Sequence, residues 1–174
     1  IHGSLLQTEK IMAVGAETGA DRLLLLGDIL YHGPRNPLPA QYDPAGVVKI
    51  LAEAPFPVIA VRGNCDAEVD ELVLPFHLAE SAWLLDGRAK IFAIHGHQLK
   101  INGGLLDAPN GGAVLSGHSH VPTAEIKGDI HFWNPGSTSL PKQNFPPSYG
   151  LYDQGRFSVI TFEGETLMSD SLPR

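Results

Sequence analysis

Four groups of polar residues that can bind metal ions each follow a short apolar segment of the sequence. The groups are Gly27-Asp28, Arg62-Gly63-Asn64-Cys65-Asp66, His95-Gly96-His97 and Gly117-His118-Ser119-His120. The apolar segments before them are 23–26, 58–61, 91–94 and 113–115. In α/β sheets, ligands bind beyond the carboxyl ends of the strands, where several strand ends meet. The pattern therefore predicts one site built from four strand ends, and His2-Gly3 is a fifth candidate group.

The residue types agree with a metal site. Carboxylate, amide oxygen and imidazole suit Mn²⁺, Zn²⁺ or Fe²⁺, and no thiolate is required. Two metal ions about 3.5–4 Å apart need a bridging carboxylate, and Asp28 is the natural choice. Such a pair would clamp a phosphoryl group, activate a bridging water and stabilise the charge of an in-line displacement.

Each group also has a purely structural interpretation. A lone Gly-Asp after a strand is more often a helix N-cap or a turn, and Asn64 beside Gly63 could be a left-handed turn residue. A single histidine near a strand end is usually a surface residue. The repetition at four strand ends, with two pairs of histidines, favours the metal site.

The first half of the sequence alternates helices with short apolar strands. Ser4 to Gln7 has the form of a capping box and Gly19 is a typical helix stop, so a helix is expected over 4–18. Asp43 and Pro44 predict the start of a second helix, which runs to about residue 54. The other elements expected here are a strand at 22–26, a Pro-rich loop at 32–39, a strand at 57–61 and a short helix at 66–73.

The second half has the pattern of an antiparallel sheet. Strands are expected at 83–85 and 90–94, a helical stretch at 103–108 and a strand at 113–115. Turns at 127–129, 153–155 and 163–165 then mark a series of hairpins. An α/β half followed by an antiparallel half predicts two packed sheets flanked by helices.

Length and composition fit one domain over residues 1–174. Hydrophobic residues make up 43% of the chain and no apolar run reaches the roughly 20 residues of a membrane span. No signal peptide is recognisable, and the single Cys65 excludes an internal disulfide, so a cytoplasmic protein is expected. The net charge of −7 argues against extended nucleic-acid binding, and an anionic substrate would need positive charge from metal ions.

In their order along the chain, the candidate residues resemble the calcineurin-like metallophosphoesterase superfamily. Its signature is Asp-x-His, Gly-Asp, Gly-Asn followed by His, Asp or Cys, a later His, and Gly-His-x-His. The matching positions are His2, Gly27-Asp28, Gly63-Asn64-Cys65-Asp66, His95 and Gly117-His118-Ser119-His120. More narrowly, the stretches 32–39, 61–66 and 134–137 resemble the small bacterial phosphodiesterases of the YfcE type.

The resemblance implies a four-layer αββα sandwich of two mixed β-sheets and a phosphodiesterase in which two divalent metals activate a water or hydroxide. Mn²⁺ is the metal expected first, with Zn, Fe or Ni as alternatives. One metal would bind His2, Asp28 and His120. The other would bind Asp28, Asn64, His95 and His118. His97 would face the substrate or orient a ligand imidazole.

The sequence departs from the family pattern at two places. The aspartate of Asp-x-His and the first strand of the fold would fall before Ile1, so the first metal keeps His2, His120 and the Asp28 bridge. Cys65 stands where many members carry a histidine that assists the leaving group; it is either a weak acid or a small packed side chain. Without that histidine, diesters with good leaving groups should be favoured. Asp66, a further catalytic candidate beside Asn64, Cys65 and His97, could equally be a helix N-cap.

The main alternative is a non-catalytic interaction scaffold on the same fold, like the retromer subunit of this superfamily. Retention of Asp28 and Asn64 favours the enzyme, and a structural single-metal site would leave His95 or His118 without a purpose. The expected substrate is a small phosphodiester, and Arg35 and His32 in the Pro-rich loop are its candidate contacts; a solvated loop arginine is the alternative. Relatives often associate, but no segment of the sequence defines a homo-oligomer interface.

Overall fold

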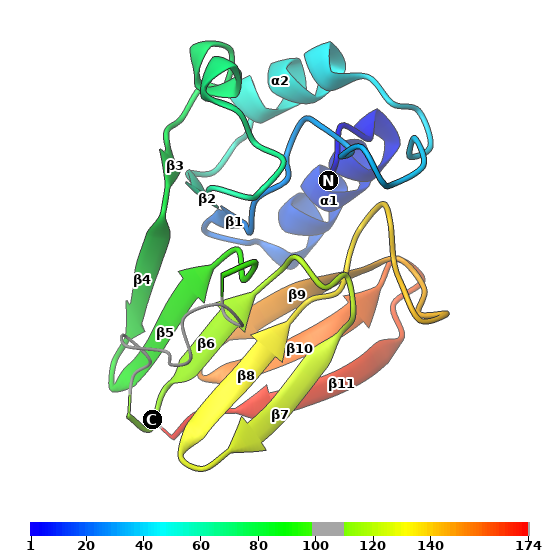
Figure 1. Cartoon of the computed structure of the whole chain (residues 1–174). Helices are drawn as coiled ribbons and strands as arrows, with labels where there is room; N and C mark the ends of the chain where they lie inside the picture. The colour runs from blue at the N-terminus through cyan, green and yellow to red at the C-terminus, as the bar shows by residue number, and fades with distance from the viewer. Residues whose placement is uncertain (99–109, 174) are drawn as a thin grey trace.

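Eleven strands form three sheets in residues 1–98 and 110–173, the part of the chain that the computed structural model describes (Figure 1). The first sheet is parallel and has the order β1-β2-β3, with bounds Leu23–Leu25, Val58–Val61 and Leu78–Ala79. The second has the order β4-β5-β6-β8-β7, with bounds Ser81–Asp86, Ala89–Ile94, Ala113–Ser116, Ile130–Asn134 and Thr123–Lys127. The third is antiparallel and has the order β11-β10-β9, with bounds Thr166–Ser171, Arg156–Thr161 and Ser148–Asp153.

Two helices cover the first sheet. Helix α1 (Leu5–Thr18) begins where the Ser4 side chain accepts a hydrogen bond from the Gln7 N–H, and it ends at Gly19, whose φ of 66° is readily adopted only by glycine. Helix α2 (Pro44–Ala52) begins where Asp43 accepts from the Gly46 N–H, with Pro44 in the first turn. Buried side chains of α2, β1 and β2 form one core, which includes Leu25, Val47, Leu51 and Ala60, and Met12 of α1 packs against it.

The second and third sheets face each other across a separate core. Trp133 of β8 stacks on Phe157 of β10 with ring centroids 4.9 Å apart and an angle of 10° between the rings. Leu24 and Leu26 contact this core, whereas Leu25 belongs to the core under the helices. Because successive residues of a strand point to opposite faces, β1 lies between the helices and the five-stranded sheet.

A cavity of about 550 Å³ lies between β1 and β9. Its lining includes Ile11 of α1, Leu24 of β1, Trp133 of β8 and Tyr149 and Leu151 of β9. Within the described residues, β1 pairs only with β2 and β9 only with β10, so the layer that contains them is two sheets rather than one continuous ladder.

The α/β class expected from the sequence is confirmed, and the helices and strands whose bounds were expected from the sequence in the described residues occur within about two residues of those bounds. The two-residue strand β3 was not expected. The short helix expected at 66–73 is the 3₁₀-helix η1 (Glu68–Leu72). The helix expected at 103–108 lies outside the described residues. None of the described helices combines the length and the apolar character needed to cross a membrane.

Candidate metal centre

The ends of four strands meet at one place and bring the predicted ligands together. Two groups form there: His2, Asp28 and His120, and Asp28, His95 and His118. Within each group the candidate ligand atoms all lie within 4.8 Å of one another. The Oδ1 atom of Asn64 lies 3.0 Å from Nε2 of His95, so Asn64 joins the second group. Asp28 belongs to both groups.

Three of the histidines are oriented by backbone carbonyl groups. The Nδ1 atoms of His2, His95 and His120 lie 3.0, 2.6 and 2.6 Å from the carbonyl oxygens of Tyr31, Leu26 and Leu140, respectively. Because a carbonyl oxygen can only accept, each Nδ1 must carry the proton. The Nε2 atom of each ring is then the one free to bind a metal, which is how second contacts commonly fix ligand histidines.

The Nε2 atoms point toward one another and toward Asp28. Nε2 of His2 lies 3.0 Å from Nε2 of His120 and 3.8 Å from Oδ2 of Asp28. Burial lowers the pKa of both His2 and His120 to about 4, so both rings are neutral near pH 7. Because both neutral rings carry their proton on Nδ1, their two Nε2 lone pairs face each other and repel. A metal ion between them would be coordinated by both lone pairs. The donor set therefore fits a metal ion.

Asp28 is buried but ionised. Burial by itself would raise the pKa of its carboxyl group, but the hydrogen bond and charge of His95 and the N–H of Cys65 bring the pKa well below its usual range. Oδ2 of Asp28 lies 3.4 Å from Nε2 of His95. Burial lowers the pKa of His95, and the Asp28 carboxylate more than offsets this, so the net direction is upward. The centre thus holds a fixed negative charge among imidazoles.

Four of the ligands have a left-handed backbone. The φ angles of His2, Asp28, His118 and His120 are 54°, 55°, 62° and 60°. Residues other than glycine adopt this region rarely and at a cost on the order of 1–3 kcal/mol each, and such residues cluster at functional sites. The strained backbone therefore coincides with the candidate ligands themselves.

Gly63 allows the Asn64 turn to approach Asp28. A Cβ atom on Gly63 would lie 2.2 Å from Oδ1 and 2.3 Å from N of Asp28, which no side chain tolerates. The close approach also lets the Cys65 N–H donate to Oδ1 of Asp28 at 2.9 Å. Glycine at this position is therefore a requirement of the site's geometry.

Asp66 holds two ligand turns together through the backbone. Its Oδ2 accepts from the N–H groups of Asp28 (2.8 Å) and Gly63 (2.7 Å), and its Oδ1 accepts from Ile29 (2.8 Å). The cap of the following 3₁₀-helix is Ala67, whose N–H donates to Asp70. Asp66 is thus neither in a ligand group nor a helix cap; it positions the turns that carry Asp28 and Asn64.

Cys65 and His97 lie beside the ligands. Burial raises the pKa of the Cys65 thiol to about 11, and the nearby Asp28 charge adds to the rise. The sulfur packs against Gly33, where an added Cβ would be 2.9 Å from it. The His97 ring centroid lies 5.5 Å from that of His95 and 6.1 Å from that of His118.

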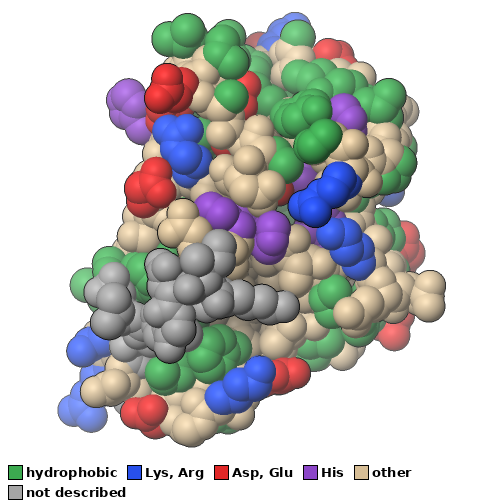
Figure 2. All heavy atoms as spheres, in the orientation of Figure 1, with side chains coloured by type: hydrophobic (Ala, Val, Ile, Leu, Met, Phe, Trp, Pro, Cys, Tyr) green, Lys and Arg blue, Asp and Glu red, His purple; other side chains and the backbone are tan. Residues whose placement is uncertain are grey.

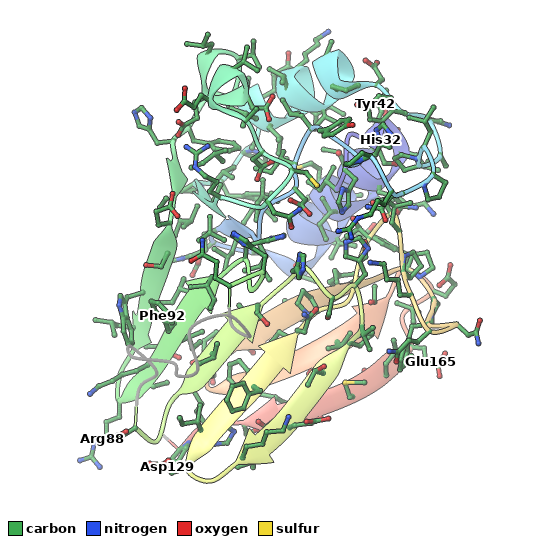
Figure 3. All side chains as sticks on the ribbon, in the orientation of Figure 1. His32, Tyr42, Arg88, Phe92, Asp129 and Glu165 are labelled. Carbon is green, nitrogen blue, oxygen red and sulfur yellow. The ribbon has the colours of Figure 1, made fainter. Side chains whose placement is uncertain are left out.

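The Pro-rich loop places His32 and Arg35 outside both ligand groups. The His32 ring packs edge-on against Tyr31 and Tyr42, with centroids 4.8 and 5.3 Å away (Figure 3). Arg35 is exposed on the same loop.

Sequence reasoning missed a second basic residue, Lys142, whose N–H donates to the His120 carbonyl at 3.2 Å. No motif or spacing distinguishes it from other loop lysines. Figure 2 shows basic side chains beside the histidines that gather across the middle of one face.

Comparisons with known proteins agree with this geometry. The calcineurin-like phosphoesterase superfamily domain matches residues 1–155. Phosphodiesterase YfcE from Escherichia coli (strain K12) is 44% identical over 172 residues, which cover 97% of this chain and 92% of that protein.

Solved structures give the same result. The structure of YfcE, described as a phosphoesterase from E. coli, superposes with a TM-score of 0.93 at 42% identity, covering 99% of this chain and 96% of that one. A Vps29 from Entamoeba histolytica complexed with Zn²⁺ has a TM-score of 0.52 at 21% identity, covering 86% and 79% of the two chains, and shares the fold alone. The resemblance seen in the sequence is confirmed, and the chain belongs to the calcineurin-like phosphoesterase superfamily.

Proposed function

We propose that this protein is a phosphodiesterase that uses two divalent metal ions held by a shared Asp28. The observation that carries the proposal is the double membership of Asp28 in two compact groups of ligand atoms. One ion would be held by His2, Asp28 and His120. The other would be held by Asp28, Asn64, His95 and His118. The 44% identity to a protein named as a phosphodiesterase supports the reaction class.

When bound, the two ions would supply positive charge for the phosphoryl oxygens and an activated water for in-line attack. The residues of the chain fix where this happens. The three carbonyl contacts hold the imidazoles in one tautomer, and Asp66 holds the turns that carry Asp28 and Asn64 in register. Such preorganised groups do not need to reorganise during the reaction.

The leaving group receives little help from Cys65. Its sulfur is packed against Gly33 and accepts a hydrogen bond from the Asn64 amide at 3.4 Å. We therefore propose a preference for diesters whose leaving group departs without a proton. The His97 ring lies beside that of His118 in the second ligand group, and we propose that it contacts the departing oxygen. Arg35 would face the substrate, and His32 would hold that loop through its ring contacts.

The donor set is imidazole, carboxylate and amide oxygen, which suits Mn²⁺ first and also Zn²⁺, Fe²⁺ or Ni²⁺. A small phosphodiester handled in the cytoplasm is the proposed substrate. A non-catalytic scaffold is the alternative, because Vps29 has the same fold. Because that Vps29 is itself complexed with Zn²⁺, metal ligands alone do not separate the two functions. The 44% identity to a protein named as a phosphodiesterase favours the enzyme.

The test combines metal content with substrate class. The protein is stripped with a chelator, reloaded with Mn²⁺, and assayed on bis(p-nitrophenyl) phosphate and on p-nitrophenyl phosphate, while bound metal is counted by mass spectrometry. We expect two Mn²⁺ per chain and much faster turnover of the diester. Stoichiometric binding without turnover of any ester would favour the scaffold, and one ion per chain would remove the shared-carboxylate mechanism.

A further inference from the structure

Asn134 ends strand β8 beside the turn that carries two of the candidate ligands. It is buried, with 4% of its surface exposed. Its Nδ2 donates to the Gly117 carbonyl at 2.7 Å and to Oγ of Ser119 at 3.1 Å, and its Oδ1 accepts from the Gly136 N–H at 2.9 Å. A carboxylate at this position could accept but not donate, so the three bonds together require the amide.

The two bonds from Nδ2 lie on either side of His118. The Ser119 N–H donates to the Gly117 carbonyl at 2.7 Å, and His118 between them has a φ of 62°. This combination is that of a classic γ-turn, which is rare and strained. A strained backbone persists only where the surrounding structure holds it. Asn134 holds this turn, because it binds the residue before His118 and the residue after it.

The bond to Oδ1 leads to the other ligand, His120. Gly136 precedes Ser137, a buried residue whose Oγ accepts from the Leu140 N–H at 3.0 Å. The Leu140 carbonyl in turn lies 2.6 Å from Nδ1 of His120 and fixes the tautomer of that ring. Asn134 therefore anchors the loop whose carbonyl orients His120.

We propose that Asn134 is a positioning residue that orients one histidine of each ligand group, His120 in the first and His118 in the second. This inference rests on the proposed two-metal function. The Asn134 side chain belongs to neither ligand group and acts through backbone turns, as Asp66 does for the turn of Asp28. Replacing a residue that orients metal ligands in this way typically weakens metal binding by about tenfold to a hundredfold.

Asn134→Asp tests this role, because it keeps the size of the side chain and the acceptor for the Gly136 N–H but removes the donor. Its carboxylate would face the Gly117 carbonyl and could not hold the turn. When chelator-stripped protein is titrated with Mn²⁺, both ions should bind about tenfold to a hundredfold more weakly than in the wild type. Electron paramagnetic resonance of the same samples should show no coupled pair of ions at the Mn²⁺ concentration that saturates the wild type.

Asp170→Ala is the control for a general loss of stability, because it also removes a buried hydrogen-bonding side chain but lies outside both ligand groups. It should lower the urea midpoint and leave the Mn²⁺ affinity unchanged. The positioning role would be overturned by an Asn134→Asp protein whose Mn²⁺ affinity stays within about threefold of the wild type, or falls no further than that of the control.

Ser119→Ala is a milder second variant, because Ser119 is exposed and loses only one of the two contacts of Nδ2. It should weaken Mn²⁺ binding by about threefold. If Asn134→Asp does not fold, an unchanged affinity in Ser119→Ala would overturn the proposal. A wild type that binds two Mn²⁺ ions but hydrolyses no diester would count against the proposed function alone, because the metal titrations still decide the positioning role.

Discussion

Two buried pairs of histidine and aspartate lie in different parts of this molecule. In the metal centre, Asp28 lies among the Nε2 atoms of His2 and His95, 3.8 and 3.4 Å from its Oδ2 atom. Between the sheets, Oδ2 of Asp170 accepts hydrogen bonds from Nδ1 of His131 at 2.5 Å and from the Trp133 indole at 2.8 Å. At the first place the neutral rings of His2 and His120 also face each other with lone pairs, whereas at the second every donor meets the Asp170 acceptor.

The two pairs also differ in backbone conformation. His131 and Asp170 lie within the regular strands β8 and β11. Asp28, in contrast, follows a strand and has a left-handed φ. Proximity of histidine and carboxylate therefore does not by itself indicate a metal site. The orientation of each ring, set by what its Nδ1 contacts, is what distinguishes a ligand from a structural ion pair.

The largest expected effect is that of Asp28→Ala. Loss of the shared carboxylate should remove bound Mn²⁺ and lower kcat/KM for an aryl phosphodiester by about a thousandfold or more. Chelator-stripped protein should unfold at nearly the same urea concentration as the stripped wild type. Metal content and kinetics measured on the same sample test this; turnover within tenfold of the wild type would exclude Asp28 as the bridge.

Asp170→Ala should have the opposite profile. It leaves the buried His131 and Trp133 donors without an acceptor, which should lower the free energy of unfolding by about 3 kcal/mol. Mn²⁺ content should stay the same. Asp129→Ala, at an exposed hairpin turn, is the control and should change stability by less than about 0.5 kcal/mol. If Asp170→Ala proves equally mild, the pair between the sheets is not a structural bond.

The pH dependence of stability should report the Asp170 pair. Burial would raise the pKa of Asp170, but hydrogen bonds from Trp133 and His131 lower it overall. A lowered folded-state pKa gives stability that is complete above the unfolded value, about 3.9, and is lost as the pH falls through the folded value. Urea midpoints of chelator-treated protein from pH 6 to pH 2.5 should therefore fall more steeply for the wild type than for Asp170→Asn. Parallel curves would contradict this account.

The smallest effect is expected at Cys65, which adjoins the ligands without being one. Cys65→Ser should change kcat/KM for an activated aryl diester by less than about threefold, because the leaving group needs little proton donation. Asn64→Ala, one residue away, should cost about a hundredfold by removing a proposed ligand. A large loss for the serine variant would assign the thiol a chemical role.

The sequence was sufficient to predict that the candidate ligands lie together, because the strands that bring them together are their neighbours in the sequence. Every candidate ligand except His2 follows an apolar strand, and the carboxyl ends of neighbouring strands meet at one edge. The buried strands and helix caps were predictable for the same reason, since Ser4 and Gly19 act on adjacent backbone. The positioning role of Asp66 was not predictable, because its partners Asp28 and Ile29 lie on another turn.

Interactions between distant segments left no pattern to detect. His131 and Asp170 are 39 residues apart, and neither stands in a motif. The position of Lys142 next to His120 follows from a backbone hydrogen bond between two loops, which the sequence does not reveal.

The contact between His2 and His120 joins residues 118 positions apart in the sequence. No short fragment of this chain can therefore assemble the first ligand group, and an unfolded chain would offer its histidines singly. Added metal should bind the native state far better than the denatured one, which raises the melting temperature with metal concentration. The thermal shift with Mn²⁺ would thus serve as a titration of correctly folded protein, readable even in a variant that has lost all turnover.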